Sequence, residues 1–303
     1  MKVRMSASHL EQIDWAHTSR TFQALGHRFA FRSTDPEMGR FVDELYGSCA
    51  IPGEPATWYS IVHSISGTRE LYVDGERLVG MDRASRLVRY ITWHVNHEVI
   101  KRTSDLVLLH AAAAAQNGVG VILPGVPEAG KTTLVAGLVR SGFQYLTDEA
   151  AAIDPATLEI EPYPKPLTID QGSWPVLSDL APAGAGEADG YHGDQWHVRP
   201  QSIRLDAISG RVSADLIIFP RFQSGASTVL EPVRRPEALM GLLRQTFRLH
   251  ERGRRNLETL AAVVRLATCY RLTSGELDEA CELVARATDR ALTQKRGRID
   301  DES

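Results

Sequence analysis

Residues 125–133, GVPEAGKTT, have types and spacing suited to holding phosphate groups. Gly125 and Gly130 followed by Lys131 and Thr132 fit the pattern GxxxxGK[ST], in which backbone N–H groups and a helix N-terminus surround phosphate oxygens. Lys131 would reach the terminal phosphates, and Thr132 would offer its hydroxyl to Mg²⁺. The sequence therefore predicts that ATP and Mg²⁺ bind at Gly125, Val126, Pro127, Glu128, Ala129, Gly130, Lys131, Thr132 and Thr133.

Two neighbouring acids, Asp148 and Glu149, follow a run that is typical of a strand, FQYLT. Enzymes that transfer phosphoryl groups use one acid at a strand end to hold Mg²⁺ and another group to orient the attacking hydroxyl. Side chains of adjacent strand residues point to opposite faces, but at a strand end one acid can meet the metal and the other an acceptor hydroxyl. Two solvated acids in a turn are the ordinary alternative for such a pair taken alone.

The order of these features resembles a known family. From His110 through "AAAAAQNGVGVILPGVPEAGKTTLVAGLVRSGFQYLTDEAAAID", the chain is similar to HPr kinase/phosphorylase and to the HPr-kinase-like proteins found beside peptide-modification genes in bacteria. The resemblance is dense over 105–175, looser to about 290, and includes the earlier segment LYVDGERLV. It implies an α/β fold, a P-loop kinase domain of the HPr kinase and PEP carboxykinase-like type with a mixed sheet, plus a smaller N-terminal α+β subdomain.

The resemblance also implies roles for particular residues. Lys131 would contact the transferred phosphate, Asp148 would act as general base toward a serine hydroxyl, and Glu149 would be a metal ligand or its neighbour. His110 would lie near the γ-phosphate, where an imidazole can donate to developing charge. A single histidine at a strand end is otherwise often an ordinary core or surface residue. The implied activity is an ATP-dependent kinase of a serine on a peptide or small protein.

Three departures from the family pattern bear on this activity. Glu128 stands where relatives carry glycine or another small residue, and its carboxylate would repel phosphates unless it faces outward. No counterpart of the "RGLG"-type segment is present, which predicts a kinase without the phosphate-removing activity. The second acid is Glu149 instead of an aspartate. The metal-binding lysine and histidine set of the carboxykinases is not found.

Weaker candidates come from basic residues and polar loops. Lys165, between two prolines, and Arg221, in FPRF, are candidate substrate contacts, although lysine and arginine are mostly solvated. The segment HERGRRN (250–256) could guide an acidic peptide or be a solvated loop. The segment APAGAGEADGYHGDQ (181–195) could be a lid over the acceptor or a plain surface loop.

Two other functions stay open at this point. The loop and the acids determine the chemistry of the phosphoryl donor and not the size of the acceptor, so a small-molecule alcohol could replace the peptide. Glu128 also leaves room for a nucleotide-gated binding protein that transfers nothing.

The surrounding sequence predicts the elements that would position these groups. A tight turn at Asp74-Gly75 predicts a hairpin, and apolar residues four apart, Leu87 to Val99, predict a helix over 85–102. Asn117-Gly118 would join two strands that lead into the loop, although the five alanines before it could favour helix. A helix would follow the loop and end near Ser141.

The expected domains are 1–104, an N-terminal α+β subdomain, 105–292, the kinase-like domain, and 293–303, a flexible tail. The net charge of −4 gives no sign of bulk nucleic-acid binding. Three scattered cysteines suggest idle, buried thiols in a reducing compartment. Without an apolar signal segment or a span of about 20 apolar residues, we expect a cytoplasmic protein that does not contact membrane. A homo-oligomer is left open.

Overall fold

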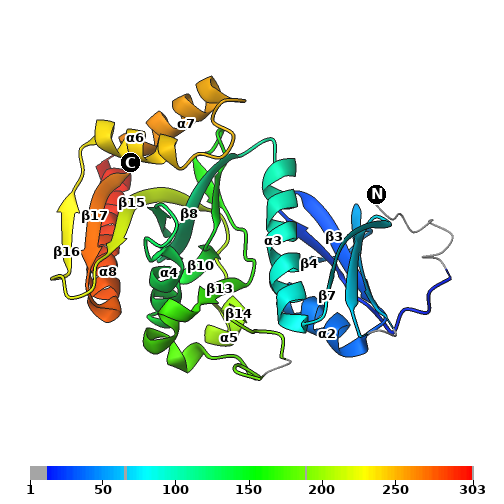
Figure 1. Cartoon of the computed structure of the whole chain (residues 1–303). Helices are drawn as coiled ribbons and strands as arrows, with labels where there is room; N and C mark the ends of the chain where they lie inside the picture. Colours follow the sequence, from blue (N-terminus) through cyan, green and yellow to red (C-terminus); the bar gives the residue numbers. More distant parts are fainter. Residues whose placement is uncertain (1–11, 65–66, 188–189, 302–303) are drawn as a thin grey trace. The chain divides into compact units, whose positions relative to one another are not determined.

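The computed structural model describes residues 12–64, 67–187 and 190–301, and the chain forms two compact units (Figure 1). The first unit comprises Met1–Thr103, Thr168–Gly172 and Asp179–Arg199. The second comprises Ser104–Leu167, Ser173–Ser178 and Pro200–Ser303. Both units contain a mixed β-sheet and helices, so the chain is of the mixed α/β class. Among the described residues, no helix is both long and apolar enough to cross a membrane.

The first unit is built on a mixed sheet in the order β4-β2-β3-β5-β6-β7, with β1 beside β3. Strands β3 and β5 pair in parallel, and the other pairs are antiparallel. The strands are β1 (His17–Thr18), β2 (Thr21–Ala24), β3 (His27–Ser33), β4 (Ala50–Ile51), β5 (Thr57–His63), β6 (Arg69–Val73) and β7 (Glu76–Met81). The 3-10 turn η1 (Gly47–Cys49) precedes β4.

Aromatic side chains fill the core of this unit. Phe29 and Tyr46 meet edge to face with ring centroids 5.3 Å apart, and Phe31 and Tyr59 lie 5.4 Å apart. All four rings are buried, so the core of this small unit is held by large apolar surfaces.

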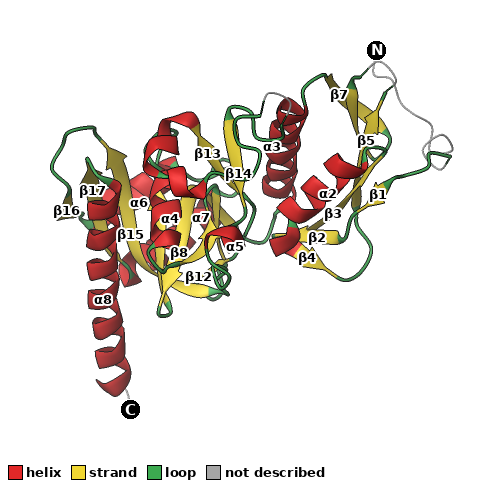
Figure 2. Ribbon diagram, turned by 90° about the horizontal axis from the view of Figure 1, so that it is seen from below, coloured by secondary structure: helices red, strands yellow, loops and turns green. Residues whose placement is uncertain are grey.

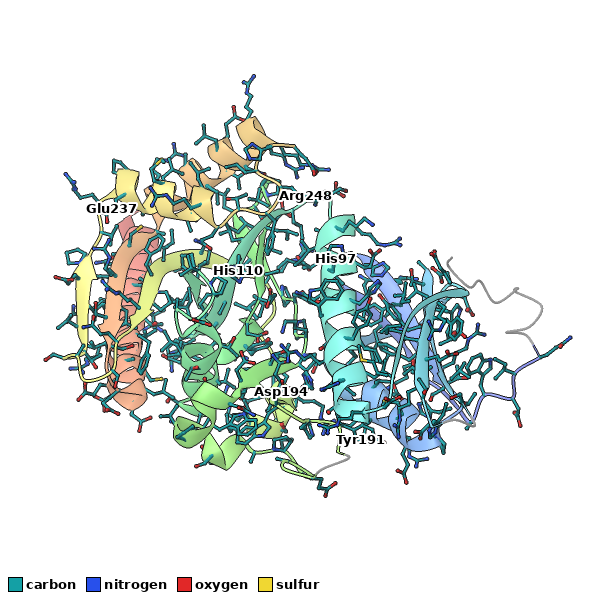
Figure 3. The ribbon with its side chains drawn as sticks, viewed as in Figure 1. His97, His110, Tyr191, Asp194, Glu237 and Arg248 are labelled. Carbon is teal, nitrogen blue, oxygen red and sulfur yellow. The ribbon has the colours of Figure 1, made fainter. Side chains whose placement is uncertain are left out.

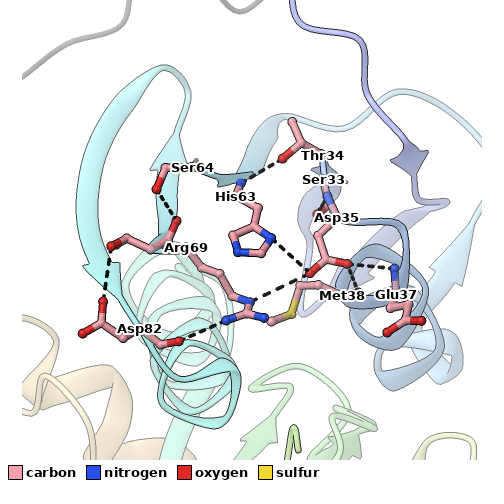
Figure 4. A network of polar contacts seen from close by, with 10 residues as sticks. Ser33, Thr34, Asp35, Glu37, Met38, His63, Ser64, Arg69 and Asp82 are labelled. Carbon is pink, nitrogen blue, oxygen red and sulfur yellow. Dashed lines mark hydrogen bonds and ion pairs between the residues drawn. The ribbon is translucent and has the colours of Figure 1, made fainter. Parts of the chain in front are cut away.

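Helices α2 (Pro36–Leu45) and α3 (Ala84–Arg102) belong to the first unit. The carboxylate of Asp35 accepts from the backbone N–H groups of Glu37 and Met38 and so caps α2, while Arg69 approaches the same carboxylate at 3.9 Å (Figure 4). The helix predicted over 85–102 is confirmed, and its stripe of Leu87, Ile91, Val95 and Val99 is buried.

The hairpin prediction is also confirmed. Asp74 and Gly75 join β6 to β7, and both have the positive φ that a type I′ turn requires.

The described part of 181–195 packs within the first unit. Tyr191 stacks on Phe41 with ring centroids 4.4 Å apart, and Asp194 pairs with Arg89 at 2.7 Å. The segment leads into β14 (Gln195–Val198), which pairs with β13 (Leu167–Asp170), and the 3-10 turns η2 (Gln171–Val176) and η3 (Ser178–Leu180) lie between. These contacts favour the surface-loop interpretation over a lid; residues 188–189 lie outside the described ranges.

The second unit has a larger mixed sheet in the order β10-β8-β11-β12-β15-β17-β16, with β9 paired to both β8 and β15. Strand β15 runs parallel to β9 and β17, whereas β8 is antiparallel to its partners. The strands are β8 (Val107–Gln116), β9 (Val119–Pro124), β10 (Gln144–Thr147), β11 (Ala150–Ile153), β12 (Glu159–Glu161), β15 (Val212–Phe222), β16 (Val229–Pro232) and β17 (Thr268–Ser274).

Helices cover both faces of this sheet (Figure 2). Helices α4 (Lys131–Arg140) and α8 (Leu277–Asp301) lie on one face, and α6 (Arg235–Arg244) and α7 (Gly253–Leu266) lie on the other; α5 (Pro200–Ile203) is a single short turn. The alanines of β8, residues 111–115, are all buried. Burial on both faces explains why this alanine run is a strand, as preferred from sequence, despite its helix propensity.

Two features of this unit were not predicted from the sequence. Helix α8 continues through residues 293–301, and Lys295 Nζ donates to Gly118 O at 3.0 Å and to Asp215 Oδ2 at 3.2 Å. The acid pair follows β10, as the run FQYLT predicted, but a second strand, β11, begins directly after it at Ala150. Both strands pair with β8, which separates them from β9.

Candidate active site

The segment 125–130 connects the end of β9 directly to the start of α4. Gly130 immediately precedes α4 with φ +86°, a backbone conformation that suits glycine. Glu128 also has positive φ, +65°, and its side chain is exposed. Glu128 therefore occupies a backbone conformation in which a β-carbon is strained, and its side chain is accessible to solvent.

Lys131 lies folded over the loop that precedes it. Its Nζ donates to the carbonyl oxygens of Gly125 at 2.8 Å and Val126 at 2.9 Å, and the side chain is buried. Burial lowers the pKa of Lys131, and the carboxylates of Glu149 and Asp148 oppose that shift. Since an ammonium group has three N–H donors, one remains for an anion in the loop.

The sheet register brings the acid pair close to this loop. In β8, Ala111 lies opposite Pro124, the last residue of β9, and the preceding residue, His110, lies opposite Ala150, which follows the acids. One edge of β8 pairs with β9, which leads into the loop, and the other edge pairs with β10 and β11, which flank Asp148 and Glu149.

Asp148 is buried, 3% exposed, and both of its oxygens have close polar neighbours. Oδ1 accepts from Tyr145 OH at 2.8 Å and pairs with Lys165 Nζ at 2.6 Å. Oδ2 lies 3.5 Å from the hydroxyl Oγ1 of Thr132 at the start of α4. Tyr145 and Lys165 therefore contact one oxygen of this carboxylate, and the hydroxyl of Thr132 contacts the other.

Lys165 and Tyr145 have positions that the sequence did not reveal. Lys165, a candidate substrate contact from sequence, is buried, 6% exposed, and its ammonium is paired with Asp148. The flanking prolines were the available signal, because they stiffen the backbone that aims this side chain. Tyr145 was not singled out, although it lies near Asp148 in the same short run.

His110 is partly buried beside the acids and Lys131. Burial lowers its pKa, the charge of Lys131 lowers it further, and Glu149 and the Gln245 side chain act in the opposite direction. Its backbone N–H donates to Gln245 O at 2.7 Å, and its ring lies 6.0 Å from that of Phe247. Figure 3 shows His110 among the side chains of the second unit.

The remaining basic candidates lie apart from these contacts. Arg221 is exposed near the end of β15, where its Cα pairs with Thr273. Within 250–256, Arg255 donates to Ser104 O at 3.2 Å and Arg254 pairs with Glu258 at 2.9 Å. These two arginines belong to the first turn of α7, so part of the expected loop is helix.

The residues at the loop fit a magnesium ion held together with phosphate. No cluster of three or more His, Cys, Asp or Glu suited to a metal occurs in 12–64, 67–187 or 190–301. Mg²⁺ usually takes only one or two protein oxygens and completes its shell with water and phosphate. Thr132 Oγ1 and Asp148 Oδ2 offer two hard oxygens of that kind.

Comparisons with known proteins add little to these observations. No family model matches the chain, and no curated protein matches it. Among solved structures, the chain is similar to the Hpr(Ser) kinase/phosphatase from Coxiella burnetii, with 11% identity, coverage of 65% of this chain and 99% of that one, and a TM-score of 0.29. At that TM-score we base no argument on the likeness, and the proposals below depend on the residues of this chain.

Proposed function

We propose that the second unit is an ATP-dependent kinase that transfers the γ-phosphoryl group to a hydroxyl, with a serine of a peptide or small protein as acceptor. The supporting observation is the convergence of the loop with the acid pair: Thr132, at the start of α4, lies 3.5 Å from Asp148 Oδ2. A phosphate-binding loop, a buried lysine and a carboxylate at a strand end are the parts that phosphoryl transfer requires.

Within this proposal, Lys131 and the backbone N–H groups at the start of α4 bind the phosphates. The third N–H of Lys131 Nζ is free to donate when Gly125 and Val126 hold the other two. His110 donates a ring N–H to the charge that develops on the transferred group. Burial and the charge of Lys131 lower the pKa of His110, which favours the neutral form of its ring.

For the acids we propose the reverse of the roles that the resemblance implies. Asp148, with one oxygen held by Tyr145 and Lys165 and the other facing Thr132, is suited to hold Mg²⁺. Glu149 lies between β10 and β11 beside Asp148, and its charge opposes the lowering of the Lys131 pKa. In this proposal it accepts the proton of the attacking hydroxyl. Bound Mg²⁺ would neutralise charge on the phosphates.

In this proposal the transfer is a single displacement at the γ-phosphorus. The acceptor oxygen forms a bond to the γ-phosphorus, the bond to the β-γ bridging oxygen breaks, and ADP leaves with that electron pair. The acceptor proton passes to Glu149.

The test is transfer of label from [γ-³²P]ATP to serine-containing peptides and, separately, to small alcohols, with the full chain and Mg²⁺. Transfer to peptides supports the proposal, and saturable transfer to a free alcohol alone would select the small-molecule alternative. Two matched variants separate the acids: Asp148→Asn should lose Mg²⁺-dependent ATP binding, while Glu149→Gln should bind ATP and lose transfer. The opposite pattern would restore Asp148 as the base.

A nucleotide-gated binding protein is the second candidate, and one observation favours it. The ammonium of Lys165 pairs with Asp148 and offsets the negative charge with which this carboxylate would hold Mg²⁺. ATP binding without transfer to any acceptor, in a folded wild-type chain, would select this candidate.

A further inference from the structure

The aromatic residue Phe222 ends β15 beside the loop at 125–133 and is exposed. Its side chain is 58% exposed, and a β-carbon built on Gly130 would lie 3.4 Å from Phe222 Cβ. Val126, within the loop, is likewise 60% exposed. Single exposed apolar residues are common, but here two of them border one loop.

The backbone holds Phe222 in this place. Its Cα pairs with Ser274 of β17, and the next residue, Gln223, donates its N–H to Ser274 O at 2.9 Å. Because β15 runs parallel to β9, the carboxyl ends of both strands reach the same edge of the sheet. The strand pairing thus holds the backbone of Phe222 next to Gly130, the glycine that precedes α4.

The topology separates Phe222 from the acid pair. Strand β9 pairs with β8 on one side and with β15 on the other. Beyond β8 lie β10 and β11, with Asp148 and Glu149 between them. A nucleotide whose terminal phosphate faces the acids extends its other end away from them. The nucleoside therefore leaves the loop on the side where β15 ends.

We propose that Phe222 is a stacking platform for the base of the bound nucleotide. The inference rests on the proposed nucleotide binding and adds a subsite to it: the loop holds phosphates, and the ring holds a planar base. Aromatic stacking accepts every base, so this site takes a nucleoside triphosphate over bare polyphosphate.

The test compares two Mg²⁺-bound ligands by calorimetry on the full chain: ATP and inorganic tripolyphosphate, which lacks the base. Wild type should bind ATP about 10-fold more tightly than tripolyphosphate, and Phe222→Ala should remove that difference by weakening ATP alone. Leu266→Ala, which shortens a comparably exposed apolar side chain at the end of α7, should leave both affinities unchanged. In Phe222→Trp, ATP and not tripolyphosphate should quench the added indole fluorescence.

Three results would overturn the subsite. ATP binding by Phe222→Ala at wild-type affinity would exclude stacking, and equal weakening of both ligands would show that Phe222 only supports the loop. Equal affinity of wild type for the two ligands would also exclude it while leaving the phosphate site intact. Binding of neither ligand to wild type would instead refute the proposed function, and the subsite with it.

Discussion

Asp148 is contacted by side chains from three separate segments of the second unit. Tyr145, Lys165 and Thr132 approach it from β10, from the proline-flanked segment and from the start of α4. A buried carboxylate is costly unless it is paired and hydrogen-bonded, so these three partners explain how the charge is tolerated. The same contacts fix the direction of Oδ2, which a metal site requires.

Removing Lys165 should therefore destabilise the fold. Lys165→Met leaves an uncompensated buried charge and should lower the free energy of unfolding by about 3 kcal/mol. The double variant Asp148→Asn/Lys165→Met should lose less than the sum of the two single variants, as measured by urea denaturation. Strictly additive losses would show that the pair is not coupled.

We expect the positive φ of Glu128, and not its charge, to destabilise the fold at this position. Glu128→Gly should raise the free energy of unfolding by up to about 1 kcal/mol, because glycine adopts positive φ without steric cost. Glu128→Gln, which keeps the β-carbon and removes the charge, should leave stability unchanged. An equal gain in both variants would assign the effect to charge repulsion.

His110 should make stability depend on pH. Its folded pKa lies below the ordinary 6.5, so the unfolded chain binds the proton more readily. The free energy of unfolding should fall as the pH drops below that value, and His110→Gln should show a smaller fall between about pH 7 and 5. Parallel profiles for wild type and variant would contradict the burial of this imidazole.

At the scale of elements, the position of α4 decides where the loop lies. A β-carbon on Gly137 would lie 2.9 Å from Cys281 Sγ and 2.9 Å from Leu277 Cδ1, so the two helices α4 and α8 meet at this glycine. Close packing of the helices thus depends on the absence of a side chain there.

Gly137→Ala should push α4 from α8, lower the free energy of unfolding by about 1–3 kcal/mol and weaken nucleotide binding. Gly297→Ala is the matched control, because that helical position in α8 is open and alanine should be neutral or favourable. Thermal denaturation compares the two, and equal behaviour would refute the role of the close contact.

Local sequence patterns predicted the turns and the helix whose signals lie within a short stretch of the chain. The turn residues Asp74-Gly75 and Asn117-Gly118, and the apolar stripe of α3, predicted structure that is present. The break between β10 and β11 and the length of α8 were not foreseen, because both depend on distant partners. Strand β8 pairs with both halves of the broken run, and Lys295 is held by residues far away in sequence.

The same limit applied to the candidate site. The motif of the loop is contiguous, and its placement between β9 and α4 followed from strand and helix signals on either side. The flanking prolines indicated a stiff backbone at Lys165, but its contact with Asp148 needs two distant segments to meet, where Tyr163 N–H donates to Leu146 O at 2.9 Å. No local pattern encodes that approach.

At the scale of the whole molecule, the candidate chemistry is confined to the second unit. The loop, the acid pair, His110 and Phe222 all belong to it. The first unit has its own sheet and aromatic core, and we assign it no part of the phosphoryl transfer. The three cysteines are buried, and burial raises the pKa of Cys269 and Cys281 to about 11, which agrees with idle thiols.

The central claim is that Lys131 and its loop hold the phosphates of a nucleotide, and calorimetric titration of the full chain with Mg²⁺-ATP measures this directly. Wild type should bind, Lys131→Ala should bind at least about 10-fold more weakly, and Lys101→Ala, which removes an exposed lysine of α3, should bind as wild type does. Equal affinity of wild type and Lys131→Ala, or no binding by a folded wild-type chain, would contradict the account.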